Sequence, residues 1–442
     1  METLKYNKGG TKLCVDGYMY TKQKDLSSGI HWRCVKRAID CKGALIVDAA
    51  TGAHNQTVRH NHPPDDAAVS VAKSRIKMKE VALASKEKPA AVVAQAVRDL
   101  SEEGKSLIKS EESLKRCIRQ QRGSAYPATP VSLRNLVVEP PWTMTAGNQP
   151  DRFLCYDNGP ETEARLLVFA SKPCLKLLAQ SSIWFMDGNF DLAPKGFLQL
   201  YFILVPLGES VVSVAYAFMT RKTQEAYEEL LTSLARECEL LGLTPSPDIV
   251  MCDFEKAAMN AVKEVIGEDV TIKACFFHLC QSTWRKVQEL GLVRLYREDN
   301  GFRTFVGMLD ALAFLPPEDV ESGMRVLKGI MQEGAGELLD YFDATYVSGS
   351  YRRVNRANDV VSLRRAPPSY PPATWNVYSA TVDGGHRTNN YSEAWNRRFG
   401  SMVGHSHPTV WKAIDALRSE ESTVTMKMAQ DRVGAASKKR CK

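Results

Sequence analysis

The feature that most constrains the fold of this chain is a regular alternation of apolar and amphipathic segments that begins at residue 181. Three apolar runs between residues 183 and 220 are separated by the turn sequences APKG and GES, which is typical of an antiparallel meander of strands. Between residues 223 and 290, three amphipathic segments alternate with two short apolar runs. This pattern predicts three helices that alternate with two further strands.

Residues 181–290 are therefore predicted to have the order β-β-β-α-β-α-β-α, which resembles the ribonuclease H fold, a mixed sheet flanked by helices. Amphipathic stretches and a Pro-rich return predict a mainly helical insertion at residues 291–385, before a closing helix within residues 386–420. The predicted fold class is α/β, more strictly α+β, with a separate small β domain near the N-terminus.

The N-terminal part of the chain has a basic excess that the rest lacks. Residues 1–126 contain 23 Lys and Arg against 14 Asp and Glu, whereas the remainder contains 35 against 37. An excess confined to one end is typical of a portion that binds nucleic acid. The alternative is a basic membrane-surface helix, but residues 71–88 offer mostly Ala and Val as the apolar face. No uncharged apolar run of about 18 residues is present, so we expect a soluble protein with no membrane partner.

Composition also suggests how the remaining segments divide. Residues 5–66 hold short β-like runs, and residues 67–125 are Ala-rich and helical, either as a helix-turn-helix-like unit with a basic last helix or as a plain spacer. A Pro-rich stretch in residues 126–180 predicts a linker and entry to the core. Residues 421–442 predict a basic tail that ends in SKKRCK, a candidate nuclear-import signal, so we expect the protein in the nucleus.

Cysteines and histidines in the β-like segment have the chemistry of a structural zinc site. Cys34 and Cys41 are followed, after a β-like stretch, by His60 and His62. Two thiolates and two imidazoles complete the tetrahedral shell of Zn²⁺ without water. The alternative is that HNH is a surface turn and that the two cysteines are buried apolar residues.

The sequences GYMY, WRC, CKG and HNH within residues 17–62 resemble a FLYWCH-type zinc finger. The resemblance implies a small antiparallel sheet held by zinc, with the two cysteines and two histidines as ligands and DNA as the partner. Basic side chains that flank the ligands are candidates for phosphate or base contacts, unless they only solubilise the domain: Arg33, Lys36, Arg37 and Lys42.

Three acidic residues lie where the predicted sheet brings them together. Asp187 ends the first predicted strand, Asp253 ends the fourth, and Glu393 lies on the closing helix. Converging carboxylates suit Mg²⁺ or Mn²⁺, and a pair of such ions supports cleavage and joining of phosphodiesters. The alternative is that each acid only caps a helix or turn, and Asp191 and Glu255 are neighbouring acids that compete for the assignment.

Four motifs across roughly residues 135–420 resemble, in order and spacing, the MULE transposase domain of Mutator-like elements. They are WFMDGNF at 184–190, CDFEKAA at 252–258, CFFHLCQ at 275–281 and RTNNYSEAWNRR at 387–398. The resemblance implies that Asp187, Asp253 and Glu393 are the catalytic acids and that Cys275 and His278 form an auxiliary element. It also implies the helical insertion between the second acid and the glutamate.

The closing helix also carries candidate donors for DNA phosphates. These are Arg387, Asn389, Asn390, Arg397 and Arg398, with capping of the helix or a solvated face as the alternatives.

The sequence as a whole favours a DNA transposase that binds the terminal inverted repeats of its element, pairs two ends as a homo-oligomer, and acts on target DNA. The alternative is a domesticated, catalytically silent transposase that acts as a DNA-binding or regulatory protein.

Overall fold

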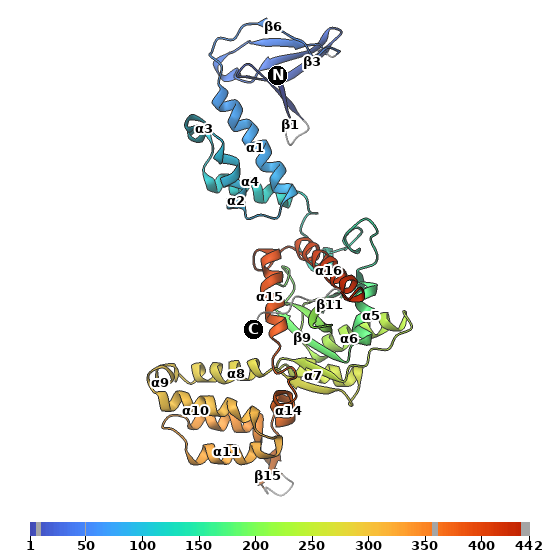
Figure 1. The fold of residues 1–442 in the computed structure, drawn as a ribbon, viewed down its shortest axis with the longest axis vertical. Coiled ribbons are helices and arrows are strands. Elements are labelled where there is room, and N and C mark those ends of the chain that lie inside the picture. Colours follow the sequence, from blue (N-terminus) through green and yellow to red (C-terminus); the bar gives the residue numbers. More distant parts are fainter. Residues whose placement is uncertain (6–9, 49, 356–360, 435–442) are drawn as a thin grey trace. The chain divides into compact units, whose positions relative to one another are not determined.

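The structure is a computed structural model that describes residues 1–5, 10–48, 50–355 and 361–434 (Figure 1). The chain forms two compact units, residues 1–128 and residues 129–442, which we describe separately. No helix in the described ranges is long and apolar enough to cross a membrane.

The first unit begins with a six-stranded antiparallel sheet whose strands follow chain order from β1 to β6. A two-residue turn joins β2 to β3, and Gly17 supplies the positive φ of +76° that such a turn needs. One face of the sheet packs a small core around Trp32 and Tyr20. The strands are β1 Glu2–Lys5, β2 Thr11–Val15, β3 Tyr18–Leu26, β4 Gly29–Cys34, β5 Ala44–Val47 and β6 His54–Val58, with the 3-10 turn Arg37–Ile39 after β4.

Four helices complete the first unit. They are α1 Asp66–Ala84, α2 Pro89–Arg98, α3 Glu102–Leu107 and α4 Glu111–Gly123. The first half of α1 packs on the sheet through Val69, and its second half joins α2 and α4 in a separate core around Met78. Arg122 donates to the carbonyls of Ala82 and Ser85 at the end of α1, so this residue of the basic helix has a structural role.

The second unit is built on a seven-stranded mixed sheet in the order β13-β12-β9-β10-β11-β8-β7. Strands β9, β10 and β11 form an antiparallel meander, and β12 and β13 run parallel to β9. The strands are β7 Leu154–Asp157, β8 Leu166–Phe169, β9 Ile183–Asn189, β10 Gln199–Leu207, β11 Ser210–Met219, β12 Ile249–Cys252 and β13 Thr271–Ala274.

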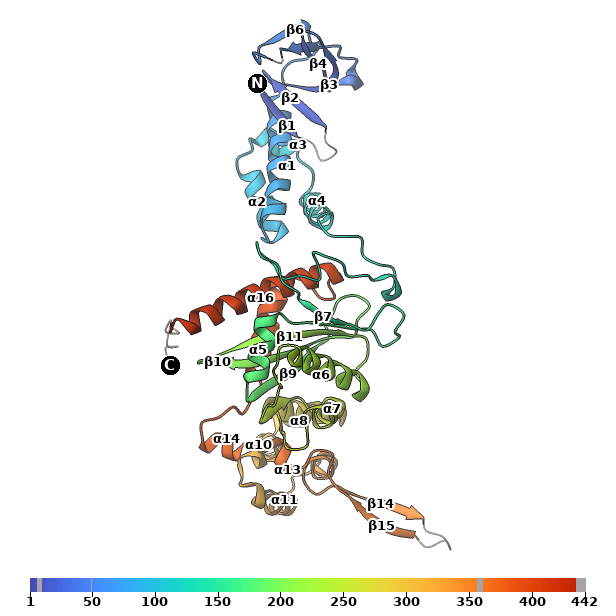
Figure 2. The same ribbon diagram turned by 90° about the vertical axis from the view of Figure 1, so that its right-hand side faces the viewer.

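Helices cover both faces of this sheet (Figure 2). On one face, Trp184 donates to Leu178 of α5 and Tyr201 packs its ring on Tyr227 of α6. The opposite face carries α15 and α16, with the Trp395 ring 4.0 Å from that of Phe202. The helices around the sheet are α5 Lys172–Gln180, α6 Gln224–Glu239, α7 Lys256–Ile266, α8 Phe276–Glu289, α15 Asn390–Val403 and α16 Val410–Arg432.

The interval between α8 and α15 is mainly helical, as the sequence predicts. It also contains a two-stranded antiparallel ribbon, β14 Ser350–Asn355 and β15 Val361–Ala366, which the sequence analysis did not predict. The helices are α9 Val293–Glu298, α10 Asn300–Ala311, α11 Val320–Gly329, α12 Gly336–Phe342, α13 Pro372–Trp375 and α14 Tyr378–Val382, with short turns at Leu312–Phe314, Pro317–Asp319 and Asp343–Val347.

Two other segments contain more regular structure than the sequence indicates. Residues 126–180, expected as a linker and the entry to the core, contain the turn Leu133–Asn135 and then β7, β8 and α5, because β8 pairs with the outer side of β11 and extends the sheet. Helix α16 runs through the expected boundary at residue 420, because its residues Val424 and Met428 are buried in the core. The SKKRCK sequence at residues 437–442 lies outside the described residues.

A buried carboxylate joins α15 and α16 to the sheet. Glu420 accepts hydrogen bonds from Ser213 of β11 at 2.8 Å and from the Trp395 indole at 3.1 Å. Arg398 donates to both oxygens of Glu420, at 2.7 and 2.5 Å. The guanidinium thus neutralises a side chain that has no exposed surface.

Replacing Arg398 by alanine leaves this carboxylate buried and unpaired, so we expect a loss of about 3 kcal/mol in the free energy of unfolding, measured by urea titration. Arg397→Ala, at the exposed neighbouring position, is the control and should change stability little. Equal effects of the two variants would contradict the structural role of Arg398.

Candidate functional site

Four candidate ligands of the first unit meet at one point. Cys34 ends β4, Cys41 follows the turn after it, and His60 and His62 follow β6. Their ligand atoms all lie within 4.8 Å of one another. Among the residues that the structure describes, no other group of three or more Cys, His, Asp or Glu gathers in this way.

Hydrogen bonds leave the correct ring nitrogens free to bind a metal ion. The Nδ1–H of His62 donates to the carbonyl of Pro63 at 2.8 Å, so the lone pair is on Nε2, which lies 3.3 Å from Cys34 Sγ. His60 Nε2 lies 2.8 Å from the Tyr20 hydroxyl, and its Nδ1 lies 3.4 Å from Cys41 Sγ. Partners of this kind fix ring orientation in zinc sites.

The backbone next to the two cysteines also suits a metal site. The amides of Lys36 and Gly43 donate to the sulfurs of Cys34 and Cys41, both at 3.4 Å. A Cβ at position 43 would lie 2.4 Å from the Nδ1 of His60, so only glycine leaves room for this ring. Two thiolates and two oriented imidazoles support a closed structural zinc site.

The basic residues near the zinc ligands are placed differently from one another. Lys36 forms an ion pair of 2.9 Å with Asp65, which caps α1, and Arg37 donates to Thr21. Arg33 is half-buried and Lys42 is exposed. Lys36 therefore stabilises the domain itself through the ion pair with Asp65, which the sequence did not indicate. Lys42 is exposed, so it stays a candidate for a DNA contact.

Chelation of zinc should unfold the six-stranded sheet, because its core around Trp32 is too small to offset the lost metal bonds. Amide hydrogen exchange should then become fast in residues 10–62 and stay slow in strands β9–β11 of the second unit. Protection that survives chelation in β4 and β5 would contradict a structural role for the metal.

The acidic site is built on the carboxyl ends of two parallel strands. In the β9–β12 register Phe185 is opposite Met251, so Asp187 and Asp253, each two residues further along the chain, lie at the same level. Asp253 directly follows the last residue of β12, whereas β9 continues past Asp187 to Asn189, so Asp187 does not end its strand as predicted. Asp187 is buried and Asp253 is half-buried. The register therefore brings these two predicted residues together.

Asn389 fixes the start of the helix that carries Glu393. Its side-chain amide donates to the carbonyl of Met186, the residue before Asp187, at 3.4 Å, and its backbone N–H donates to Cys275 Sγ at 3.1 Å. Glu393 is in the first turn of α15, so this anchor holds it at the same edge of the sheet as the two aspartates.

The pKa values of the acidic residues reflect how close these residues lie to one another. Burial, together with the charges of Asp253 and Glu393, raises the pKa of Asp187 to about 7. Burial also raises the pKa of Asp253, which the cations of Lys222 and Arg285 oppose. The three carboxylates repel one another, yet they are not gathered as tightly as the Cys and His group.

The structure separates the roles of Cys275 and His278. Cys275 is buried, burial raises the pKa of its thiol, and its sulfur accepts the Asn389 bond, so it is an anchor. His278 lies close enough to Glu393 for that charge to raise its pKa, although the larger effect of burial lowers it. Its Nδ1 is buried with no protein partner among the described residues.

Sequence reasoning missed two cations of the site, Lys222 and Arg285, and named Glu255 only as a competing acid. Lys222 follows β11 and forms an ion pair of 3.3 Å with Glu255, and Arg285 is on α8 two turns after His278. Glu255, set aside as a competing acid, has its pKa raised by burial and then by the charge of Asp253. A seven-residue spacing between His278 and Arg285 on one predicted helix was the available signal.

The predicted donors on the closing segment divide into two groups. Asn389 is buried and Arg398 binds Glu420, so both have internal roles. The other three are exposed and stay candidates for DNA contacts: Arg387, Asn390 and Arg397.

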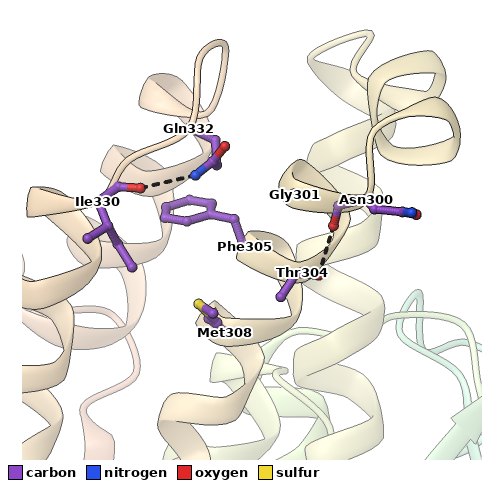
Figure 3. Close-up of a pocket in the computed structure, with 7 residues that line it drawn as sticks. All are labelled: Asn300, Gly301, Thr304, Phe305, Met308, Ile330 and Gln332. Atoms are coloured by element: carbon purple, nitrogen blue, oxygen red, sulfur yellow. Dashed lines mark hydrogen bonds between the residues drawn. The ribbon is translucent and has the colours of Figure 1, made fainter.

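The helical insertion has a separate cavity of about 340 Å³ (Figure 3). Its lining residues are Asn300, Gly301, Thr304, Phe305, Met308, Ile330 and Gln332. None of these seven is ionisable, so the cavity offers no acid, base or nucleophile.

The raised pKa of Asp187 predicts a pH dependence of stability without added divalent ions. The folded state holds this proton more tightly than the unfolded state, so the stabilisation present at low pH is lost as pH rises towards about 7. The melting temperature of wild type should therefore fall more between about pH 5 and about pH 8 than that of Asp187→Asn. Added Mg²⁺ should reduce the fall in wild type, and parallel curves would contradict the shift.

Comparison with known proteins agrees with both parts of the chain. Residues 183–282 match the family model of the MULE transposase domain, and residues 3–62 match that of the FLYWCH zinc finger domain. No curated protein matches the chain. The first match covers β9 to α8, including Asp187 and Asp253, and the second covers the Cys and His cluster. Both resemblances drawn from the sequence are confirmed: the chain carries an N-terminal FLYWCH zinc finger domain and a MULE transposase domain.

Proposed function

We propose that the protein is a DNA transposase that cleaves and joins DNA with Asp187, Asp253 and Glu393. The observation that carries the proposal is the gathering of these acids, from two strands and a helix, at one edge of the sheet, where Asp187 is buried and its pKa is raised to about 7. Like charges held close together destabilise a fold, so a cluster of this kind is typical of a functional site, where catalysis or metal binding requires it.

We further propose that the sheet is a ribonuclease H-like core. Its inner strand order β11-β10-β9-β12-β13, with an antiparallel meander followed by two strands parallel to β9, supports this. Helices on both faces, an acid on β9 and an acid directly after β12 are consistent with the same fold.

The donor set fits Mg²⁺ or Mn²⁺, because carboxylate oxygens are the ligands that these ions prefer. The three acids would hold the metal, which supplies activation of a water or 3′-hydroxyl and stabilisation of the leaving oxygen. The deprotonated form of Asp187 is the one that can bind, and a neighbouring cation favours that form.

The cations at the rim of the site would hold the DNA strand. Lys222 and Arg285 already act on the charge of Asp253, and phosphate oxygens accept bonds from such side chains. His278 has a ring nitrogen without a partner in the described structure and could donate to a phosphate or a leaving oxygen.

The finger would supply recognition of the terminal inverted repeats. Every residue of β6 is exposed, and its sequence HNQTV offers side chains that can bond to base edges. The basic excess of residues 1–126 supports phosphate binding by this unit. We propose that two or more copies pair the element ends on DNA, in the nucleus.

Asp187→Asn, Asp253→Asn and Glu393→Gln should each reduce Mn²⁺-dependent nicking of a duplex that carries the element's terminal sequence by at least about 100-fold. Nicking is measured on a labelled duplex with the full-length, zinc-loaded protein. The control is Asp191→Asn, an exposed acid in the turn after β9, which should retain the wild-type rate.

Equal nicking by wild type and the three variants would reject catalysis by these acids. Binding without nicking by the wild type would favour the domesticated, silent transposase. A loss with Glu255→Gln but not with Glu393→Gln would move the third role to Glu255.

A further inference from the structure

The ribbon of β14 and β15 has a composition unlike the helices around it. The two strands read SYRRVN and VSLRRA, with four arginines and no acidic residue. The two strands pair with each other in a sheet of their own (Figure 2). A two-stranded ribbon is at best marginally stable by itself in water, so this charge is concentrated on an element with little stability of its own.

The described end of the ribbon gathers two cations and an aromatic ring. Tyr351 is the cross-strand partner of Arg365, and Arg364 precedes Arg365 on β15. All three side chains are exposed. A polyanion that lies along the ribbon would therefore meet two guanidinium groups beside a tyrosine ring.

The described acids compensate little of this charge. Arg365 has an oxygen of Glu321 at 3.8 Å and also donates to the carbonyl of Ser348. Arg364 is exposed and forms no ion pair with any described residue. Tyr351 is 70% exposed, so the ribbon presents a large aromatic ring together with its cations.

The base of the ribbon is fixed to the insertion. Gly349 has φ of +78°, and a Cβ there would lie 2.1 Å from the carbonyl oxygen of Ala366, so glycine is required where β14 begins. The amide of Ser348 donates to the carbonyl of Asp343 at 2.8 Å, and the side chain of Asp343 pairs with Lys328. In both views the ribbon extends away from the helices of the insertion (Figures 1 and 2).

We propose that the β14–β15 ribbon is a second DNA-contacting element, which binds duplex DNA outside the finger and the acidic site. A two-stranded ribbon fits the major groove, and arginine can bind phosphates or guanine edges with two parallel bonds. The inference rests on the proposed function in that DNA is the partner. It adds a contact that belongs to the catalytic unit and does not depend on zinc.

The test is the salt dependence of DNA affinity, measured by fluorescence anisotropy with the full-length, zinc-loaded protein and a labelled duplex of about 30 base pairs, without divalent ions. Arg364→Ala should weaken binding and reduce the slope of log affinity against log salt by about 1, and Arg364→Lys should largely restore the slope. The matched control is Arg294→Ala, an exposed cation of α9 that pairs with Glu298 and should bind like wild type.

A ribbon deletion gives a second, independent variant. Ser350 and Ala366 are cross-strand partners, so Asn-Gly can replace residues 351–365 and close the chain with a two-residue turn. This variant should shorten the hydroxyl-radical footprint on the duplex while its melting temperature stays close to that of wild type. Unchanged affinity, slope and footprint in a folded deletion variant would overturn the proposal.

Failure of this proposal can be told apart from failure of the proposed function. Asp187→Asn should keep the wild-type affinity and salt slope while it loses nicking. A catalytic protein whose ribbon variants bind normally would reject the ribbon alone.

Discussion

The second unit depends on holding like-charged carboxylates together against their mutual repulsion. The parallel register of β9 and β12 puts Asp187 and Asp253 at one level, and Asn389 ties the start of α15 to the same edge. Further along α15, Trp395 packs on the sheet and Arg398 holds buried Glu420. The binding energy of these neutral and paired contacts offsets the electrostatic cost of the acids, so the anchors of α15 are as necessary to the site as the acids are.

The anchors also explain why some residues of the motifs do not face a substrate. Cys275 and Asn389 lie inside two motifs with exposed or charged neighbours, but the backbone N–H of Asn389 donates to the sulfur of Cys275 and its side-chain amide donates to Met186. In the predicted pair of Cys275 and His278, it is His278 whose Nδ1 has no partner among the described residues. A single motif can therefore contain one residue whose hydrogen bond stabilises the fold and another whose side chain has a nitrogen without a described hydrogen-bond partner and can act on a substrate.

Much of the sheet could be predicted from the sequence, because its strands are long apolar runs and its helices have clear amphipathic periods. The short strands β7 and β8 could not, because they follow a Pro-rich stretch that indicates a linker, and because tertiary contacts fix their place: β8 pairs with β11, and β7 pairs with β8. The Cys and His cluster could be predicted from residue chemistry together with the resemblance to the FLYWCH family. The internal roles of Lys36, Asn389 and Arg398 could not be predicted, because their partners Asp65, Met186 and Glu420 lie far away in the sequence.

Helix α1 has a consequence for how the two parts of the first unit are oriented. One continuous helix packs on the six-stranded sheet at Val69 and on the small helical bundle at Met78, so it sets both the spacing and the rotation between them. Each residue inserted between these two points would turn the sheet by roughly 100° about the helix axis and move it about 1.5 Å. The length of α1 thus fixes which side of the helical bundle lies below a given face of the sheet, and a change of one or two residues would turn that side away.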